Sequence, residues 1–372
     1  MKKINLFVLA VMALTACTKQ QTTGIHLENL DTTAVAQNDF YQYACGGWMK
    51  NNPIPDEYSR FGSFDKLGLS NLEQVNGLIA DIAAGTHKMG SIPQKIGDVY
   101  NLSMDTARRN QEGIAPVLPV LQEIENVTDK AQWSEVLGKA MDFGLWAMYV
   151  DADAMNSSMN ILNEYQAGFA LSQKDYYIDE DEHTKHIREE YVKHVEKMFE
   201  LFGQENAAEK AQTVLRLETR LANAALSNVE LRDPVANYNK MSVEELQKLV
   251  PEVDWKVYFA GLNIAPDSLS VGQVRHLQEA GKMLAEESLE DMKTLFTWQV
   301  IDGSADFLTE EIFMQNFEFY GRILSGRQEP TPLWKRAVAM VNGTLGEAVG
   351  QMYVEKYFPE ENKERMIGLV KN

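Results

Sequence analysis

Apolar residues recur along most of this chain at intervals of three and four, the spacing of one face of an α-helix. The segment 71–84 shows the pattern clearly through Leu72, Val75, Ile79 and Ile82. The same pattern predicts further helices over 128–141, 186–202, 206–225, 242–249, 288–300, 309–319 and 346–358. We therefore expect a mainly α fold, a multi-helix lobe with few short strands.

Capping residues set the expected ends of several helices. Thr128, Ser242, Ser288 and Thr309 are expected N-caps, and the sequence SVEE at 242–245 has the spacing of a capping box. Gly203 is expected to end the helix before it.

Few segments have the character of strands. Only 268–271 and 147–150 are short candidates, and no fixed-period repeat is visible. The longest irregular stretch is expected over 44–64, which contains two adjacent glycines and two prolines.

The N-terminus has the pattern of an export signal. A positive start is followed by an apolar run from Ile4 to Leu14, and then by Leu14-Thr15-Ala16-Cys17, which resembles a bacterial lipoprotein cleavage box. We expect residues 1–17 to be the signal peptide, Cys17 to carry the lipid, and 18–35 to be a tether. The alternative is an ordinary signal peptide with a chance cysteine. The prediction is an exported protein, lipid-anchored to a bacterial cell-envelope membrane.

Composition narrows the class of protein further. Hydrophobic residues make up 45% and charged residues 24%, as in soluble globular domains. The formal net charge of −19 disfavours nucleic acid as a partner, because phosphates require neutralisation by Lys and Arg. If Cys17 is lipidated, Cys45 is left as a free thiol or as a cysteine without its partner.

Candidate chemistry is sparse. None of the six histidines is followed by glutamate, so the zinc-binding motif H-E-x-x-H is absent, and no P-loop or G-x-S-x-G is present. His183, His186 and His194 could share one helical face and are the best metal candidates, but the acidic residues before them also suit a solvated helix start.

Four ordered segments carry a family resemblance. Residues 38–48 read NDFYQYACGGW and are followed by IP at 54–55 and RFGSFD at 60–65; residues 171–177 read LSQKDYY, 232–240 read RDPVANYNK, and 346–354 read GEAVGQMYV. Together they resemble the N-terminal domain of the neprilysin and endothelin-converting enzyme family of zinc metallopeptidases. The motif residues that match are Asn38, Asp39, Phe40, Tyr41, Gly46, Gly47, Trp48, Pro55, Asp175, Tyr176, Tyr177, Arg232, Asp233, Tyr238, Asn239, Gly350 and Tyr353.

We expect these motif residues to be structural. Gly46 and Gly47 would permit a backbone turn, and Trp48 would be an anchor in a core or an interface. The segment 232–234 would form a turn with Tyr238 packed behind it, and 175–177 would close a loop. None of them supplies a catalytic group or a metal ligand.

The resemblance implies a function for a larger protein. Residues 36–372 would be the helical lobe that shapes and gates the substrate cavity of a zinc metalloendopeptidase hydrolysing small peptides. The zinc and the catalytic residues would lie in a catalytic lobe beyond this sequence, so we expect the chain to be a truncated product or a partial sequence, without bound zinc and inactive alone. Its partners would be peptide substrates, through the missing lobe, and the membrane, through the lipid anchor.

Two departures and two alternatives accompany this hypothesis. Leu67-Gly68-Leu69 stands where family members place an arginine for the substrate carboxylate, so that mode of recognition is not expected here. Glu287 and Asp291 have the spacing of a second family motif, but without a zinc motif they are expected to be two charges on an exposed helix. The alternatives are a non-enzymatic helical surface lipoprotein that binds ligands, or a regulator that kept only the helical lobe.

Overall fold

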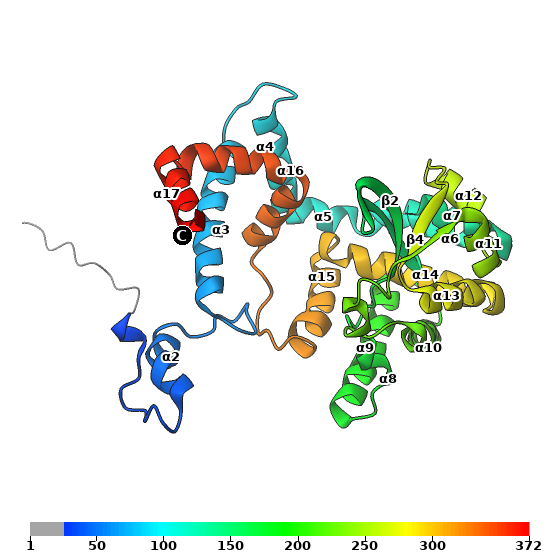
Figure 1. Ribbon diagram of the computed structural model, residues 1–372, viewed down its shortest axis with the longest axis horizontal. Helices are drawn as coiled ribbons and strands as arrows, with labels where there is room; N and C mark the ends of the chain where they lie inside the picture. Colours follow the sequence, from blue (N-terminus) through cyan, green and yellow to red (C-terminus); the bar gives the residue numbers. More distant parts are fainter. Residues whose placement is uncertain (1–25, 141, 372) are drawn as a thin grey trace, which may run out of the picture. The chain divides into compact units, whose positions relative to one another are not determined.

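The computed structural model describes residues 26–140 and 142–371 (Figure 1). The expected signal peptide, Cys17 and the first part of the expected tether lie outside these residues. The chain divides into two compact units, residues 1–66 and 67–372, each of which is described by itself.

The first unit contains a short 3-10 helix, η1 (Leu27–Asn29), and the helix α2 (Phe40–Asn51). Asp39 caps α2 by accepting a hydrogen bond from the Gln42 amide at 2.9 Å. The expected irregular stretch over 44–64 is therefore wrong in its first part, because residues 44–51 are helical.

The expected turn at Gly46 and Gly47 is also wrong. A Cβ on Gly47 would lie 2.3 Å from the Glu28 carbonyl oxygen, and one on Gly46 would lie 2.6 Å from the Asp31 Cβ. The two glycines thus let the segment 28–31 run against the helix, which compensates for their poor helix propensity.

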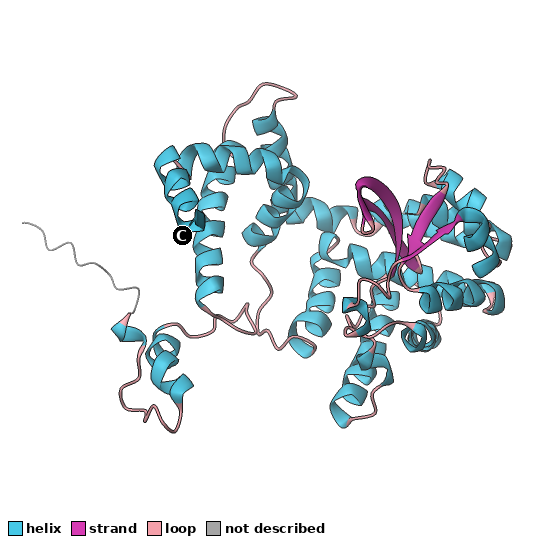
Figure 2. Ribbon diagram, in the orientation of Figure 1, coloured by secondary structure: helices cyan, strands magenta, loops and turns pink. Residues whose placement is uncertain are grey.

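The second unit is mostly helical (Figure 2). Its α-helices are α3 (Ser63–Ala83), which begins four residues before the unit boundary, α4 (Ile92–Met104), α5 (Thr106–Glu112), α6 (Leu118–Glu125), α7 (Trp133–Lys139), α8 (Asp175–Ile178), α9 (Glu182–Leu201), α10 (Ala207–Ala224), α11 (Val243–Leu249), α12 (Trp255–Gly261), α13 (Val274–Glu286), α14 (Leu289–Ser304), α15 (Glu310–Asn316), α16 (Leu333–Tyr357) and α17 (Glu360–Lys371). The shorter elements are the 3-10 helices η2 (Ala115–Val117), η3 (Lys130–Gln132), η4 (Glu230–Arg232) and η5 (Ala305–Phe307) and the π-helix η6 (Phe317–Ile323). The expected mainly α fold is confirmed.

One four-stranded sheet interrupts the helices, in the strand order β1-β2-β4-β3. Its strands are β1 (Trp146–Asp153), β2 (Asn156–Gln166), β3 (Asn239–Ser242) and β4 (Ser268–Val271). β2 pairs antiparallel with β1 and parallel with β4, and β3 pairs antiparallel with β4. Both expected strands are present, whereas β2 and β3 were not predicted.

Three apolar clusters stabilise the second unit. The largest joins the sheet to α7, α12, α13 and α14, and the second lies among α8, α9, α10, α14 and α15. The third lies between α3, α4 and α16. The helices α10 and α14 contribute to both of the first two clusters. A side chain between these two helices can therefore be enclosed by residues of several elements.

The predicted helix ends are mostly correct. Ser242 forms the expected capping box, Ser288 and Thr309 are N-caps, and Gly203 has a positive φ of 67° after α9. The predicted cap at Thr128 is wrong, because Asp129 caps η3 and α7 begins only at Trp133. No helix among the described residues is long and apolar enough to cross a bilayer.

Candidate functional site

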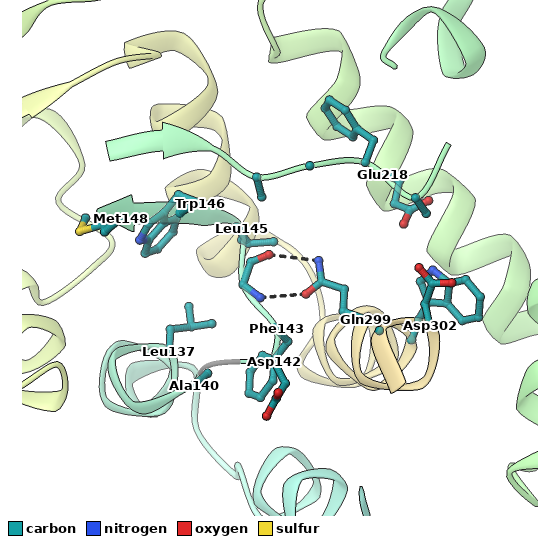
Figure 3. A pocket seen from close by; sticks show the side chains of 18 of the residues that line it. Leu137, Ala140, Asp142, Phe143, Leu145, Trp146, Met148, Glu218, Gln299 and Asp302 are labelled. Atoms are coloured by element: carbon teal, nitrogen blue, oxygen red, sulfur yellow. Dashed lines mark hydrogen bonds between the residues drawn. The ribbon is translucent and has the colours of Figure 1, made fainter. Parts of the chain in front are cut away.

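The second unit contains a pocket of about 580 Å³ beside α14 (Figure 3). Its wall is formed by the end of α7, the segment leading into β1, the segment 167–170 after β2, and parts of α10, α12 and α14. Aromatic side chains provide much of the lining, namely Phe143, Trp146, Phe169, Tyr258 and Trp298. The volume lies in the range of small-molecule pockets.

Gln299 fixes one side of this pocket. Its amide accepts a hydrogen bond from the Gly144 N–H at 2.9 Å and donates one to the Gly144 carbonyl at 3.0 Å. Each polar atom of the side chain makes one hydrogen bond to Gly144, so α14 holds the entry into β1 in place.

Glu218 on α10 is the pocket's most buried charged residue, with 6% of its surface exposed. Its Oε2 accepts hydrogen bonds from the hydroxyls of Tyr177 at 3.0 Å and Tyr191 at 2.7 Å. Each hydroxyl in turn accepts an N–H, from the Leu171 backbone at 3.1 Å and from the Trp298 indole at 2.9 Å. The network is therefore directed toward Glu218 from both sides.

Asp302 on α14 lies in the same pocket and has no such network. Its Oδ1 is buried and has no hydrogen-bond partner within 26–140 and 142–371. The buried Tyr320 hydroxyl makes no hydrogen bond of ordinary geometry among these residues, but it lies close enough to favour the ionised form of Asp302 as a hydrogen-bond donor. Figure 3 shows the carboxyl groups of Glu218 and Asp302 facing the same part of the pocket.

Burial shifts both carboxyls in the same direction. Desolvation raises the pKa of Glu218 to about 8, against the opposing effect of the two tyrosine hydroxyls. Desolvation also raises the pKa of Asp302 to about 7. The charge of Asp302 raises the Glu218 pKa further, so the proton is lost from this pair at a higher pH than from a solvated carboxyl.

The described residues that line this pocket belong to the second unit, and the motif residues of the first unit are described separately. Trp48 stacks on Phe61 with ring centroids 6.2 Å apart, which agrees with the expected packing role. Cys45 is half-buried and carries a free thiol beside Trp48, in a separate pocket of about 640 Å³.

The motif residues of the second unit separate into three places. Asp175 and Tyr176 lie in α8 with Tyr177, the only one of these motif residues that hydrogen bonds to Glu218. Gly350 and Tyr353 lie on α16, where the Tyr353 hydroxyl accepts a hydrogen bond from Asn71 at 2.8 Å. The segment 175–177, which was expected to close a loop, therefore forms a short helix whose buried Tyr177 hydroxyl donates to Glu218.

The RDP motif forms the expected turn. Asp233 accepts hydrogen bonds from the backbone amides of Val235 and Ala236, both at 3.0 Å. The Tyr238 hydroxyl does not simply pack behind this turn, since it donates to Asp153 at 2.7 Å. Asn239 begins β3 and donates to the Val271 carbonyl at 2.9 Å. The arrangement is structural.

Glu218 and Asp302 were not identified from the sequence, although a signal exists. The buried face of α10 carries Ala211, Val214, Leu217 and Leu221, and Glu218 lies within that stripe. A charged residue inside an apolar helical stripe rarely occurs without a partner or a function. Asp302 follows Trp298 by four residues on α14 in the same way.

The histidines do not form a metal centre. His183 and His186 are exposed near the start of α9, whereas His194 is buried and stacks on Phe319 with ring centroids 5.0 Å apart. Burial lowers the pKa of His194 to about 3. Within 26–140 and 142–371 no group of three or more His, Cys, Asp or Glu side chains is placed to hold a metal ion, so these residues do not fit zinc.

The expectation for Glu287 and Asp291 is wrong. The two residues do not share one helix, because Glu287 follows the end of α13 as its C-cap and Asp291 lies in α14. Arg216 bridges them, with Nη1 2.7 Å from Glu287 and Nη2 2.9 Å from Asp291. They are part of an ion-pair cluster that joins α10 to α13 and α14, and Glu287 is largely buried in it.

Comparison with known proteins gives the family. The N-terminal-domain model of peptidase family M13 matches residues 36–372. The chain is 25% identical over 358 residues to endothelin-converting enzyme 1 of Bos taurus, covering 92% of this chain and 47% of that protein. It is also 25% identical to endothelin-converting enzyme-like 1 of Mus musculus, again over 92% of this chain and 47% of that protein. The chain thus spans about half the length of the curated relatives it matches.

Solved structures agree with this result. The inhibitor complex of the zinc metalloprotease Zmp1 of Mycobacterium tuberculosis matches with a TM-score of 0.88 and 30% identity, over 94% of this chain and 54% of that one. PepO of Lactobacillus rhamnosis has the same fold, with a TM-score of 0.75 at 19% identity over 91% of this chain and 54% of that one. By the match of the family model over 36–372, this chain belongs to peptidase family M13, whose N-terminal lobe it forms.

Proposed function

We propose that this chain is the substrate-enclosing helical lobe of a lipid-anchored zinc metalloendopeptidase that hydrolyses small peptides. The observation that carries the proposal is the M13 match over residues 36–372, since M13 peptidases are zinc-dependent. The similarity to Zmp1 over 94% of the chain supports the same conclusion.

The zinc and the catalytic groups are assigned to residues outside this sequence. His183 and His186 are exposed, His194 is buried among aromatic rings, and H-E-x-x-H is absent from the sequence. No step of peptide hydrolysis is therefore attributed to this chain. Its contribution would be to wall the cavity, to restrict the size of peptides that enter, and to exclude bulk water.

The surface of α17 supports contact with a further part of a longer protein. Its apolar side chains Met366, Ile367, Leu369 and Val370 are exposed, and none of its described residues is buried. An apolar helical face of this kind is typical of an interface. In the proposed peptidase the catalytic lobe would cover it.

Peptide hydrolysis tests the proposal. We expect the purified chain alone to leave a short fluorogenic peptide intact. A longer product whose frame continues through H-E-x-x-H should hydrolyse the peptide and lose that activity with a zinc chelator. Chelator-sensitive hydrolysis by the chain alone would show that the assignment of catalysis to residues elsewhere is wrong. An inactive longer product with bound zinc would contradict the peptidase function.

The lipid anchor has its own test. Cells fed radiolabelled palmitate should label the wild-type protein, and Cys17→Ala should abolish the label. Cys45→Ala is the matched control and should retain it. Labelling that survives Cys17→Ala would contradict the anchor at Cys17 without affecting the peptidase proposal.

A further inference from the structure

The pocket beside α14 has no place in the function proposed above. It lies within the helical unit, and two carboxyl groups, from Glu218 and Asp302, face into it. The exposed acid Asp142 lies elsewhere on its wall. Acidic side chains alone do not make a binding site, so the argument depends on how these two are satisfied.

A buried carboxyl is costly unless hydrogen-bond donors replace its water. Only Oε2 of Glu218 receives such donors, from Tyr177 and Tyr191, and no group in the described part of the chain hydrogen bonds to Oε1. The Oδ1 of Asp302 is buried without a hydrogen-bond partner among the described residues, and Tyr320 supplies the one hydroxyl that acts on this carboxyl. Acceptors on two neighbouring helices therefore face the same space without a donor.

The same chain shows what a fully satisfied buried carboxyl looks like. Asp153, 2% exposed, accepts from the Tyr238 hydroxyl at 2.7 Å, the Lys240 ammonium at 2.9 Å and the Met155 amide at 2.9 Å. Glu164, 1% exposed, also has one oxygen without a partner, but it does not line the pocket. Glu218 and Asp302 have fewer donors than Asp153 and do line the pocket, so an occupant of the pocket can supply donors to them.

The lining defines the chemistry of that occupant. No Lys or Arg side chain of the described residues lines the pocket, so it does not suit an anion. Among the described residues no group of three or more His, Cys, Asp or Glu side chains is placed to hold a metal ion, so the pocket suits a hard metal cation poorly. The aromatic walls, by contrast, favour an organic cation, because rings attract a cation by their faces and cover an apolar stem.

We propose that this pocket binds a primary ammonium ligand on an apolar stem, with its N–H groups donating to Asp302 and to Glu218 Oε1. Its stem packs against Phe143, Phe169 and Trp298. A primary ammonium has three donors, which suits acceptors that converge from α10 and α14. The site does not depend on the proposed peptidase function, and all of the residues that form it belong to this chain.

The first experiment needs no variant. The purified full chain is titrated by calorimetry with n-butylammonium, and separately with n-butanol, which has the same stem and no charge. We expect saturable binding of the amine and at least about tenfold weaker binding of the alcohol. Equal binding of the two, or no binding of the amine, would overturn the proposal.

Substitutions then locate the site. Asp302→Asn should weaken n-butylammonium binding at least about tenfold, because it removes the unpaired carboxylate while keeping the shape. Asp142→Asn is the matched control and should change affinity less than about twofold, since that acid is exposed and screened. Equal losses in both variants would mean general attraction to an acidic surface and would overturn the site.

A third probe distinguishes two sources of the ammonium group. Nα-acetyl-lysine amide presents the lysine side chain as a peptide would. Saturable binding of this probe that is lost in Asp302→Asn would support the proposal and assign lysine side chains as ligands. Binding of n-butylammonium alone would also support it and assign a free small amine.

Discussion

Two regions of the second unit bury carboxyl groups and treat them in opposite ways. Asp153 ends β1 and is surrounded by three donors, whose hydrogen bonds, with that of Lys240 first, lower its pKa to about 2. Glu218 and Asp302 lie between helices, and desolvation raises their pKa values to about 8 and about 7. Burial alone therefore does not decide the state of an acid; the number of donors that replace water does.

The largest expected effect comes from removing the centre of the helical network. Glu218→Ala would leave the Tyr177 and Tyr191 hydroxyls buried without an acceptor and open a small cavity. We expect a loss of about 3 kcal/mol in the free energy of unfolding. Urea denaturation followed by circular dichroism measures it.

Gln212→Ala, at an exposed position of the same helix, is the control for Glu218→Ala. It should change the free energy of unfolding by less than about 0.5 kcal/mol. If the two variants were equally stable, the Glu218 network would contribute nothing to the fold, and the contrast with Asp153 would lose its energetic basis.

The second effect is a pH dependence of opposite sign in the two regions. Glu218 and Asp302 have folded-state pKa values above their ordinary values, so the folded chain binds more protons and stability falls as pH rises from about 5 to about 8. Raising the pH from 6 to 8 should cost on the order of 4 kcal/mol. The pKa of Asp153 is lowered instead, so its contribution is present above about pH 4 and is lost as pH falls toward about 2.

Several titratable groups face the pair and stay protonated between pH 6 and 8. They are Tyr177 on α8, Tyr191 on α9 and Tyr320 on η6, whose pKa values are all raised by burial. Comparing the melting temperature of wild type with Asp302→Asn at pH 6 and 8 isolates the carboxyl from the general charge of −19. The variant should show a smaller fall; an unchanged pH dependence would mean that Asp302 does not titrate in this range.

The sequence predicted the fold better than it predicted this site. Helical periodicity and caps located α9, α10, α11 and α14 because their local signals agree with their packing. The strand β2 was not predicted because its first half is rich in Asn and Ser, which have low strand propensity. It is held by pairing with β1 and β4, a tertiary cause that no local pattern contains.

The prediction for the glycine pair in α2 was wrong, and the acid in α10 was not predicted, for related reasons. Gly46 and Gly47 were interpreted as a turn from their conformational freedom, whereas their use is the close passage of residues 28–31. Glu218 was visible as a charge in an apolar stripe, but Tyr177, Tyr191 and Asp302 come to it from three other helices. Which residues meet in a buried site depends on helix packing, and helix packing was not predictable from the sequence.

The smallest expected change in stability comes from removing single tyrosine hydroxyls, in two matched variants. The Tyr320 hydroxyl is buried with no hydrogen-bond partner in the described residues, so Tyr320→Phe should change the free energy of unfolding by less than about 0.5 kcal/mol. Tyr238→Phe removes a 2.7 Å hydrogen bond to Asp153 and should lower the melting temperature, since Asp153 then keeps only two of its donors. Differential scanning calorimetry of both variants gives the comparison at the level of single oxygen atoms. A larger loss in Tyr320→Phe than in Tyr238→Phe would mean that Asp302 receives a donor in solution after all, and the pocket would then be as well satisfied as the strand end.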